Sequence, residues 1–391
     1  MGQSARVAYR LGDLRAHPVT WPGIAAPGER VVHFVLPGDV DDPTAPSGGN
    51  TYDLRVCRDL PAAGWRVRRY AAHGGWPRPD ATARAELALF LGGLPDGATV
   101  LLDGLVACAV PEVLETHAAG RLRTAVLVHL PLGDETGLAP DAAAELDARE
   151  RRTLHAVRAV VATSKWAARR LITHHGLAPD RVHVARPGAD AAPLAPGTDG
   201  TGLLCVAAVT PRKGQDRLVT ALAAVADLPW SCVCVGGLGR DGEYVAQLRK
   251  KIIGFGMDER IHLAGPRAGA ELDASYAAAD LLVLTSYAET YGMVVTEALA
   301  RGIPVLATAV DGVPEAVGLA PDGSVPGLLV PSDDPAALVG ALRGWLGEPE
   351  LRYELRKAAR ERRATLERWE MTSQSLARVL ERLRHEPRGA G

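Results

Sequence analysis

The chain has 391 residues, which exceeds the roughly 250–300 residues at which a single hydrophobic core stops growing, so we expect two domains. Hydrophobic residues make up 47% of the chain and charged residues 23%, as in ordinary globular proteins, and no apolar tract is long enough for a membrane-spanning helix. The formal net charge of −2 argues against a general nucleic-acid binder, and five cysteines without paired CxxC spacing indicate neither a disulfide framework nor a zinc site.

The amino terminus reads MGQSARVAYRLGDLR and lacks the apolar stretch of a secretory signal, so we expect a cytoplasmic protein. Residues 1–29 precede the first clear strand, and we assign them no element or role.

Short β-branched apolar runs then alternate with longer helix-patterned stretches, which predicts a βα alternation along both halves of the chain. In the first half the predicted strands are 31–36, 65–71, 99–102, 124–129, 159–163 and 182–185. In the second half they are 203–209, 230–235, 260–263, 281–285, 304–308 and 327–330.

Residues 187–202, rich in Pro, Gly, Ala and Asp, separate the two sets of strands and predict a linker. We therefore predict an α/β fold of two facing, Rossmann-like, doubly wound parallel sheets, with ligands bound beyond the carboxyl ends of the strands. The predicted domains are 1–190 and 203–365, joined by a linker over 191–202. Residues 366–391 are predicted to form a C-terminal helix that packs back on the first domain.

The most informative motif is SYAETYGMVVTEALARGIPV, which begins where the strand 281–285 ends. A helix that starts near Gly292 directs its free N–H groups and the positive end of its dipole at the ligand edge of the sheet, which suits a diphosphate. Glu289 precedes this helix and Glu297 lies within it, so two carboxylates bracket the expected anion site. Because a carboxylate repels a diphosphate, we expect both to accept hydrogen bonds from sugar or ribose hydroxyls.

The pattern E-T-Y-G-x-x-x-x-E-A-x-A-x-G-x-P-V resembles the signature of glycosyltransferase family 4, whose members are retaining enzymes with the two-domain GT-B fold. The resemblance implies that Glu297 holds the ribose hydroxyls and that Glu289 contacts the donor sugar. It also implies that the backbone amides of Gly292, Met293 and Val294 meet the sugar and the phosphates.

Two further segments of the second half are similar to the same family. Arg212 and Lys213 follow the first strand of the nucleotide domain, where the family has a lysine on the diphosphate. Family members usually carry an arginine at the position of Ala208, and we expect Arg212 to replace that cation. Pro266 and Arg267 resemble the loop that frames the nucleotide base.

In the first half, Gly48, Gly49 and Asn50 are similar to the family's glycine-rich loop that touches the donor, and two glycines allow close backbone approach. A plain turn is the alternative. His129 ends a predicted strand and matches the family's histidine near the reacting sugar, although a histidine at this position is also compatible with a structural role.

Two other patterns are weaker. Residues 237–242, GLGRDG, match the dinucleotide fingerprint GxGxxG, but they follow the second strand of their domain, which disfavours a nicotinamide dehydrogenase. The acidic run Asp39-Val40-Asp41-Asp42 mimics the Asp-x-Asp of metal-dependent glycosyltransferases, and we expect it to be solvated.

The resemblance implies a retaining glycosyltransferase that uses a nucleotide-diphosphate sugar, most simply a UDP- or GDP-sugar, with no metal or other cofactor. We expect an acceptor hydroxyl on a small or soluble molecule, such as a natural product or an aminocyclitol. Asp134 and Glu135, shortly after His129, are candidate ligands for an amine-bearing acceptor. The open alternatives are a non-catalytic nucleotide-sugar-binding module, an enzyme directed at lipid or polysaccharide, and a phosphorylase or epimerase on the same architecture. The oligomeric state is not indicated.

Overall fold

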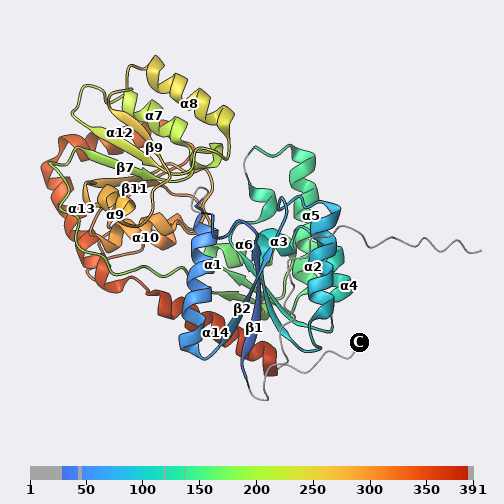
Figure 1. Cartoon of the computed structure of the whole chain (residues 1–391). Coiled ribbons are helices and arrows are strands. Elements are labelled where there is room, and N and C mark those ends of the chain that lie inside the picture. The colour runs from blue at the N-terminus through green and yellow to red at the C-terminus, as the bar shows by residue number, and fades with distance from the viewer. Residues whose placement is uncertain (1–28, 43–45, 119, 136, 386–391) are drawn as a thin grey trace, which may run out of the picture.

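A computed structural model describes residues 29–42, 46–118, 120–135 and 137–385, which form two α/β domains joined by an extended segment (Figure 1). Residues 1–28, to which the sequence analysis assigned no element, lie outside the described residues.

The first domain is built on a six-stranded parallel sheet with the strand order β2-β1-β3-β4-β5-β6. Its strands are β1 (Val31–Pro37), β2 (Arg66–Ala72), β3 (Thr99–Asp103), β4 (Arg123–Val128), β5 (Ala159–Ala162) and β6 (Val182–Val184). Its helices are α1 (Gly48–Asp59), α2 (Ala81–Gly93), α3 (Gly104–Ala107), α4 (Pro111–His117), α5 (Pro140–Ala156) and α6 (Lys165–His175). Short 3-10 turns are η1 (Leu60–Ala63), η2 (Leu132–Asp134) and η3 (Pro179–Arg181).

The second domain repeats this plan with the strand order β12-β11-β10-β7-β8-β9. Its strands are β7 (Gly202–Val206), β8 (Ser231–Val235), β9 (Ile261–Gly265), β10 (Leu281–Leu284), β11 (Val305–Thr308) and β12 (Gly327–Val330). Its helices are α7 (Gln215–Ala223), α8 (Gly242–Gly254), α9 (Gly269–Ala277), α10 (Met293–Ala300), α11 (Val313–Val317), α12 (Pro335–Gly347) and α13 (Pro349–Arg362). The turns η4 (Pro211–Lys213) and η5 (Arg363–Thr365) complete this part, and α14 (Trp369–His385) follows.

Local sequence explains most of these elements. The central strands are continuous apolar runs that are buried on both faces, as the covered sheets of α/β proteins require. Several helices begin at a side chain that accepts a hydrogen bond from their first turn, including Ser47 before α1 and Ser164 before α6. The α/β prediction of two doubly wound parallel sheets is confirmed, and the ends of the predicted strands differ from the observed ends by at most three residues. The largest difference is at β7, whose ladder with β8 ends at Val206.

The sheet orders define where ligands are expected to bind. Strand order reverses between β1 and β3 in the first sheet, and between β7 and β10 in the second. In such sheets the crevice beyond the strand ends at the point of reversal is the usual ligand site. The segments that follow β1, β3, β7 and β10 are therefore the ones that position a functional site.

Helix α14 leaves the second domain and packs against the first. In Figure 1 it runs beneath the sheet, beside α1 and the strands β1 and β2. Its buried apolar side chains share one core with Phe34 of β1 and Tyr52 of α1. These side chains of α14 are Trp369, Leu376, Val379, Leu380 and Leu383. The ring of Tyr52 meets Trp369 edge to face at 5.7 Å. The two domains are thus joined by the linker and by a returning helix.

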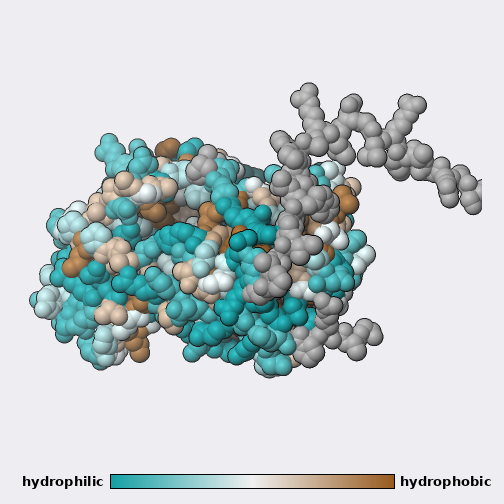
Figure 2. Space-filling view, turned by 60° about the horizontal axis from the view of Figure 1, so that its bottom comes forward, coloured by the Kyte–Doolittle hydropathy of each residue, from teal (hydrophilic) through white to brown (hydrophobic). Residues whose placement is uncertain are grey.

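The surface in Figure 2 is mostly hydrophilic, and the hydrophobic residues on this face lie in small separate patches. Within the described parts of the chain, no helix combines the length and the apolar character needed to cross a membrane.

Candidate active site

The amino-terminal end of α10 forms the centre of the candidate site. Gly292, the residue before this helix, has φ 91° and ψ 66°, a left-handed conformation that favours glycine, and no side chain caps the helix. The first-turn residues Met293 and Val294 are half-buried. Amides at an uncapped helix start bind anions well, so this turn can hold phosphate or sugar oxygens.

Lys213 and Glu289 meet directly beside this helix. The Lys213 ammonium contacts the Glu289 carboxylate, and the two side chains are 16% and 13% exposed. Burial by itself raises the pKa of Glu289, but the positive charges of Lys213 and Arg212 outweigh burial and hold that pKa below its ordinary value. Glu289 is therefore a carboxylate at neutral pH, and a bound diphosphate would compete with it for Lys213, whose own pKa is lowered by burial.

Arg212 connects the two domains. Its Nε donates to Oε1 of Glu135 at 2.9 Å, and its Nη1 donates to the Ala288 carbonyl at 3.1 Å. Its own carbonyl accepts from the amide of Tyr287 at 2.8 Å. The guanidinium thus lies next to the loop that carries Glu289.

Glu297 projects from α10 toward α9. The hydroxyl of Tyr276, a fully buried residue of α9, donates to Oε2 of Glu297 at 2.7 Å. Pro266 and Arg267 lie in the loop between β9 and α9, and Nη1 of Arg267 donates to Oγ of Ser275 at 2.8 Å. The candidate base loop and the candidate ribose carboxylate are thus linked through α9, and this linkage fixes the orientation of Glu297.

The first turn of α1 consists of Gly48, Gly49 and Asn50, whereas the sequence predicted a loop for these residues. The helix starts here because Ser47 accepts a hydrogen bond from the Asn50 amide at 3.0 Å. A Cβ atom on Gly48 would lie 3.8 Å from Sδ of Met293, across the domain junction. One on Gly49 would lie 3.2 Å from Cδ2 of the His129 ring. The starts of α1 and α10 thus face each other, with His129 beside them.

His129 follows β4 and is held by two buried carboxyl groups that the sequence analysis missed. Its Nε2 lies 2.8 Å from Oδ1 of Asp53 on α1 and 3.5 Å from Oδ2 of Asp103 at the end of β3. Its carbonyl accepts a hydrogen bond from Thr290 of the second domain at 2.6 Å. Asp103 carried a usable signal, since it is a polar residue at the end of a strand beside the point of reversal. Asp53 carried none, because it lies inside a helix.

The charges of the three groups influence one another. Burial raises the pKa of Asp53 to about 8, although a hydrogen bond with Asp103 opposes the shift. Burial and the charge of Asp53 raise the pKa of Asp103 as well. Burial lowers the pKa of His129, so the imidazole is neutral at pH 7. A neutral histidine held by a carboxyl pair is suited to hydrogen bonding with a sugar hydroxyl and to moving a proton.

Asp134 and Glu135, the candidate acceptor ligands, both have arginine partners. Asp134 accepts from Nη2 of Arg170 at 3.0 Å, and Glu135 accepts from Arg212. The two carboxylates lie close to His129 in the chain, but they do not form an unpaired acidic patch.

The two weaker patterns have ordinary structural roles. Asp41 of the acidic run forms an ion pair with Arg69 at 2.5 Å. A Cβ on Gly237, Gly239 or Gly242 would meet no atom within 4 Å, so the loop after β8 has no close approach that requires glycine.

The chain is similar to known glycosyltransferases. A family model described as "Glycosyl transferases group 1" matches residues 190–362, from the linker to the end of α13. The D-inositol 3-phosphate glycosyltransferase 1 of Catenulispora acidiphila is 35% identical over 269 residues, which cover 64% of this chain and 62% of that protein. The D-inositol 3-phosphate glycosyltransferase of Jonesia denitrificans is 30% identical over 296 residues, which cover 70% of this chain and 67% of that protein.

Two solved structures share the fold. Sucrose-phosphate synthase from Thermosynechococcus elongatus superposes with a TM-score of 0.72 and 22% identity, over 91% of this chain and 99% of that one. Anabaena HepE in complex with UDP and glucose superposes with a TM-score of 0.69 and 17% identity, over 90% of this chain and 99% of that one.

Proposed function

Because this chain belongs to glycosyltransferase family 4, the retaining GT-B glycosyltransferases, we propose that it transfers a sugar from a nucleotide-diphosphate sugar to an acceptor hydroxyl. The observation that carries the proposal is the convergence of Lys213, Glu289 and the uncapped start of α10 at the strand reversal of the second sheet. In this proposal the second domain binds the donor and the first domain binds the acceptor. His129 and the start of α1 face the reacting sugar.

The proposed mechanism relies on positioning and on electrostatic stabilisation of the leaving group. Lys213, Arg212 and the amides of Gly292, Met293 and Val294 stabilise the negative charge that develops on the nucleotide diphosphate. The bond from the anomeric carbon to the phosphate oxygen breaks while the acceptor oxygen attacks from the same face. The acceptor proton passes to the departing phosphate oxygen, and the configuration at the anomeric carbon is retained.

The ribose and the sugar have separate partners in this scheme. Glu297, oriented by Tyr276, accepts hydrogen bonds from the ribose hydroxyls. Glu289, released from Lys213 by the diphosphate, accepts from a sugar hydroxyl, and Asn50 and the two glycines before it line the opposite side. Pro266 and Arg267 frame the base.

A thermal-shift panel of UDP-, GDP-, ADP- and dTDP-sugars tests donor binding, because a ligand that binds only the folded protein raises the melting temperature. UDP-glucose is the first choice, since HepE has been solved with it. We expect a UDP- or GDP-sugar to raise the melting temperature by several degrees. If none of the four classes does so and no donor is consumed, the proposal fails.

Proton NMR of the earliest product tests the chemistry, and an inverted anomeric signal would reject retention. Donor binding without any product or donor hydrolysis would indicate a binding module instead of an enzyme.

We propose that the transfer needs no metal, because Lys213 and Arg212 supply the positive charge. A requirement for Mg²⁺, with loss of turnover in EDTA and recovery on adding Mg²⁺ alone, would contradict this.

We propose a small cyclitol as the acceptor, since both curated relatives are named for D-inositol 3-phosphate. A phosphate on the acceptor would replace Asp134 as the partner of Arg170, whereas an amine would bind the carboxylates themselves. Initial rates with an inositol phosphate, neutral inositol and an aminocyclitol separate these cases. The double variant Asp134→Asn/Glu135→Gln should raise the KM for an amine-bearing acceptor, and an unchanged KM would remove the carboxylates from the acceptor site.

A further inference from the structure

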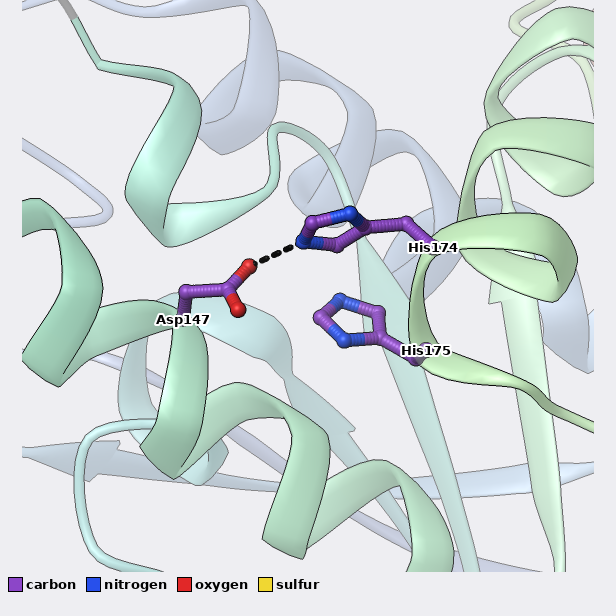
Figure 3. A group of neighbouring side chains, drawn as sticks. All are labelled: Asp147, His174 and His175. Carbon is purple, nitrogen blue, oxygen red and sulfur yellow. Dashed lines mark hydrogen bonds and ion pairs between the residues drawn. The ribbon is translucent and has the colours of Figure 1, made fainter.

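A second group of metal-ligating side chains lies in the first domain, away from the donor-binding helix α10. His174 and His175 are the last residues of α6, and Asp147 and Glu150 lie one turn apart on α5. Figure 3 shows Asp147 and the two histidines pointing toward one another from these two helices.

The distances suit a bound cation. Nε2 of His174 lies 2.5 Å from Oδ1 of Asp147, and Asp147, His174 and His175 each offer one ligand atom within 4.8 Å of the other two. A tetrahedral Zn²⁺ ion with bonds of about 2.0–2.2 Å keeps its ligand atoms about 3.3–3.6 Å apart. The three side chains can therefore reach one ion through small rotations.

Buried polar atoms without partners point to a missing ligand. His175 and Glu150 are each 1% exposed. Among the described residues, the two ring nitrogens of His175 have no hydrogen-bond partner, and Oε1 of Glu150 has none either. Nε2 of His175 lies 3.4 Å from Oε1 of Glu150. Buried polar groups are normally satisfied, because an unmade hydrogen bond in the interior costs free energy. An ion bound by His175 would satisfy one ring nitrogen directly.

We propose that Asp147, His174 and His175 form a binding site for a divalent transition-metal ion of the Zn²⁺ type. Two imidazoles with a carboxylate favour Zn²⁺, Co²⁺ or Ni²⁺ over Mg²⁺ and Ca²⁺, which prefer oxygen ligands alone. Glu150 completes the site from the buried side, since a carboxylate beside a ligating histidine orients its ring.

The site is connected to the acceptor side of the candidate active site. Oε2 of Glu150 accepts a hydrogen bond from the Leu132 amide at 2.6 Å, and a Cβ on Gly133 would lie 3.3 Å from Cβ of Asp147. Leu132 and Gly133 belong to η2, which follows His129. The ion therefore fastens α5, α6 and this turn together, and its role is structural and separate from the sugar-transfer step.

The other three-residue group, Asp53, Asp103 and His129, does not carry the same inference. It belongs to the candidate active site, and Nε2 of His129 is already bonded to Asp53.

The test uses the full-length chain without a histidine tag, stripped with EDTA and dialysed. Calorimetric titration with Zn²⁺ should give one bound ion per chain. Bound Co²⁺ should give visible absorption bands typical of nitrogen and oxygen ligands. His174→Ala and Asp147→Asn should each weaken Zn²⁺ binding by about 10–100-fold or more, since even losing a partner of a ligand has an effect of this size. Zn²⁺ should also raise the melting temperature of the unmodified chain but not of these variants.

His262→Ala is the matched control, because His262 is an exposed histidine of the second domain and should leave binding unchanged. His174 is exposed, so its loss should not prevent folding, and circular dichroism checks this. If His174→Ala does not fold, the Zn²⁺ affinity of Asp147→Asn relative to the unmodified chain decides the test. Equal Zn²⁺ affinity in the unmodified chain and in the folded variants would overturn the proposal. Loss of binding in His129→Ala with retention in His174→Ala would also overturn it, by moving the ion to the active site.

Discussion

At the scale of single residues, the two cations after β7 carry the proposed leaving-group stabilisation. Arg212→Ala and Lys213→Ala should each lower kcat by roughly 10²–10³, the effect of losing one oriented donor to developing negative charge. Steady-state kinetics with saturating donor measures this. Arg240→Ala, an exposed arginine of the loop after β8, should keep full activity.

The role of Arg212 needs a separate test, because its guanidinium donates a hydrogen bond to Glu135 of the other domain. If Arg212→Ala keeps near-full kcat while Lys213→Ala loses it, Arg212 joins the domains and does not act on the diphosphate.

The carboxyl pair behind His129 makes a prediction about stability and pH. A folded-state pKa of about 8 for Asp53 lies above its unfolded value, so the folded protein keeps a proton that the unfolded chain releases. Stability contributed by this group is therefore lost as pH rises toward 8, at up to about 1.4 kcal/mol per pH unit for a full proton. His129 opposes this slope near pH 6.5, because an unfolded histidine is about half protonated there while the buried ring is neutral, and this opposing contribution fades as pH rises toward 8.

Urea unfolding at several pH values in this range measures the slope. Asp53→Asn, a neutral side chain of similar shape, should flatten it, whereas Asp333→Asn at an exposed position should not. An unchanged slope in Asp53→Asn would show that the pair is ionised in the folded protein.

At the scale of elements, α14 makes the first domain dependent on the end of the chain. Trp369 is 5% exposed and packs on Tyr52, whose hydroxyl donates to the Ala185 carbonyl. Trp369→Ala should lower the free energy of unfolding by about 3–5 kcal/mol, as for other buried large side chains. Met371→Ala, 44% exposed on the same helix, should change it by less than about 0.5 kcal/mol. Comparable urea midpoints for the two variants would mean that α14 does not stabilise the fold.

The start of α11 supports the loop that carries Glu289. Gly312 donates its amide to the Glu289 carbonyl at 2.9 Å, and a Cβ on Gly312 would lie 2.0 Å from the carbonyl oxygen of Thr290. Gly312→Ala should therefore displace this loop and lower kcat/KM for the donor by at least about tenfold, since small misplacements of reacting groups are costly. Gly340→Ala, inside α12 with no atom within 4 Å of the added methyl, should raise stability by about 0.5–1 kcal/mol and keep activity. Normal donor kinetics in Gly312→Ala would show that the loop tolerates the shift.

At the scale of the whole molecule, Glu315 of α11 holds the two domains together. Its carboxylate accepts from the amides of Lys165 and Trp166, at the start of α6, and from Nε of Arg186 at 2.5 Å. Glu315→Ala leaves this helix start without its carboxylate partner and leaves Arg186 with Glu367 as its remaining ion-pair partner, which costs about 1–3 kcal/mol. We expect faster proteolysis of the linker, a larger radius of gyration by small-angle scattering, and kcat/KM lower by about tenfold. Glu354→Ala, exposed on α13, is the control, and equal scattering profiles would contradict the role of Glu315.

The sequence by itself determined the elements and the nucleotide-side motif. Apolar runs such as Leu281–Leu284, ended by polar or glycine residues, specify buried parallel strands because burial on both faces requires uninterrupted apolar character. The spacing of Glu289, Gly292 and Glu297 specifies a strand, a turn and a helix start, which are local features of the chain.

Only the tertiary structure decided which side chains meet across elements. Asp53 joins Asp103 and His129 because the sheet order places β1, β3 and β4 side by side. Arg212 meets Glu135 because the domains face each other, and Asp147 meets His174 because the fold brings the end of α6 near α5. Periodicity reports the face on which a residue lies, whereas contacts between distant residues depend on strand order and packing, which no local pattern encodes.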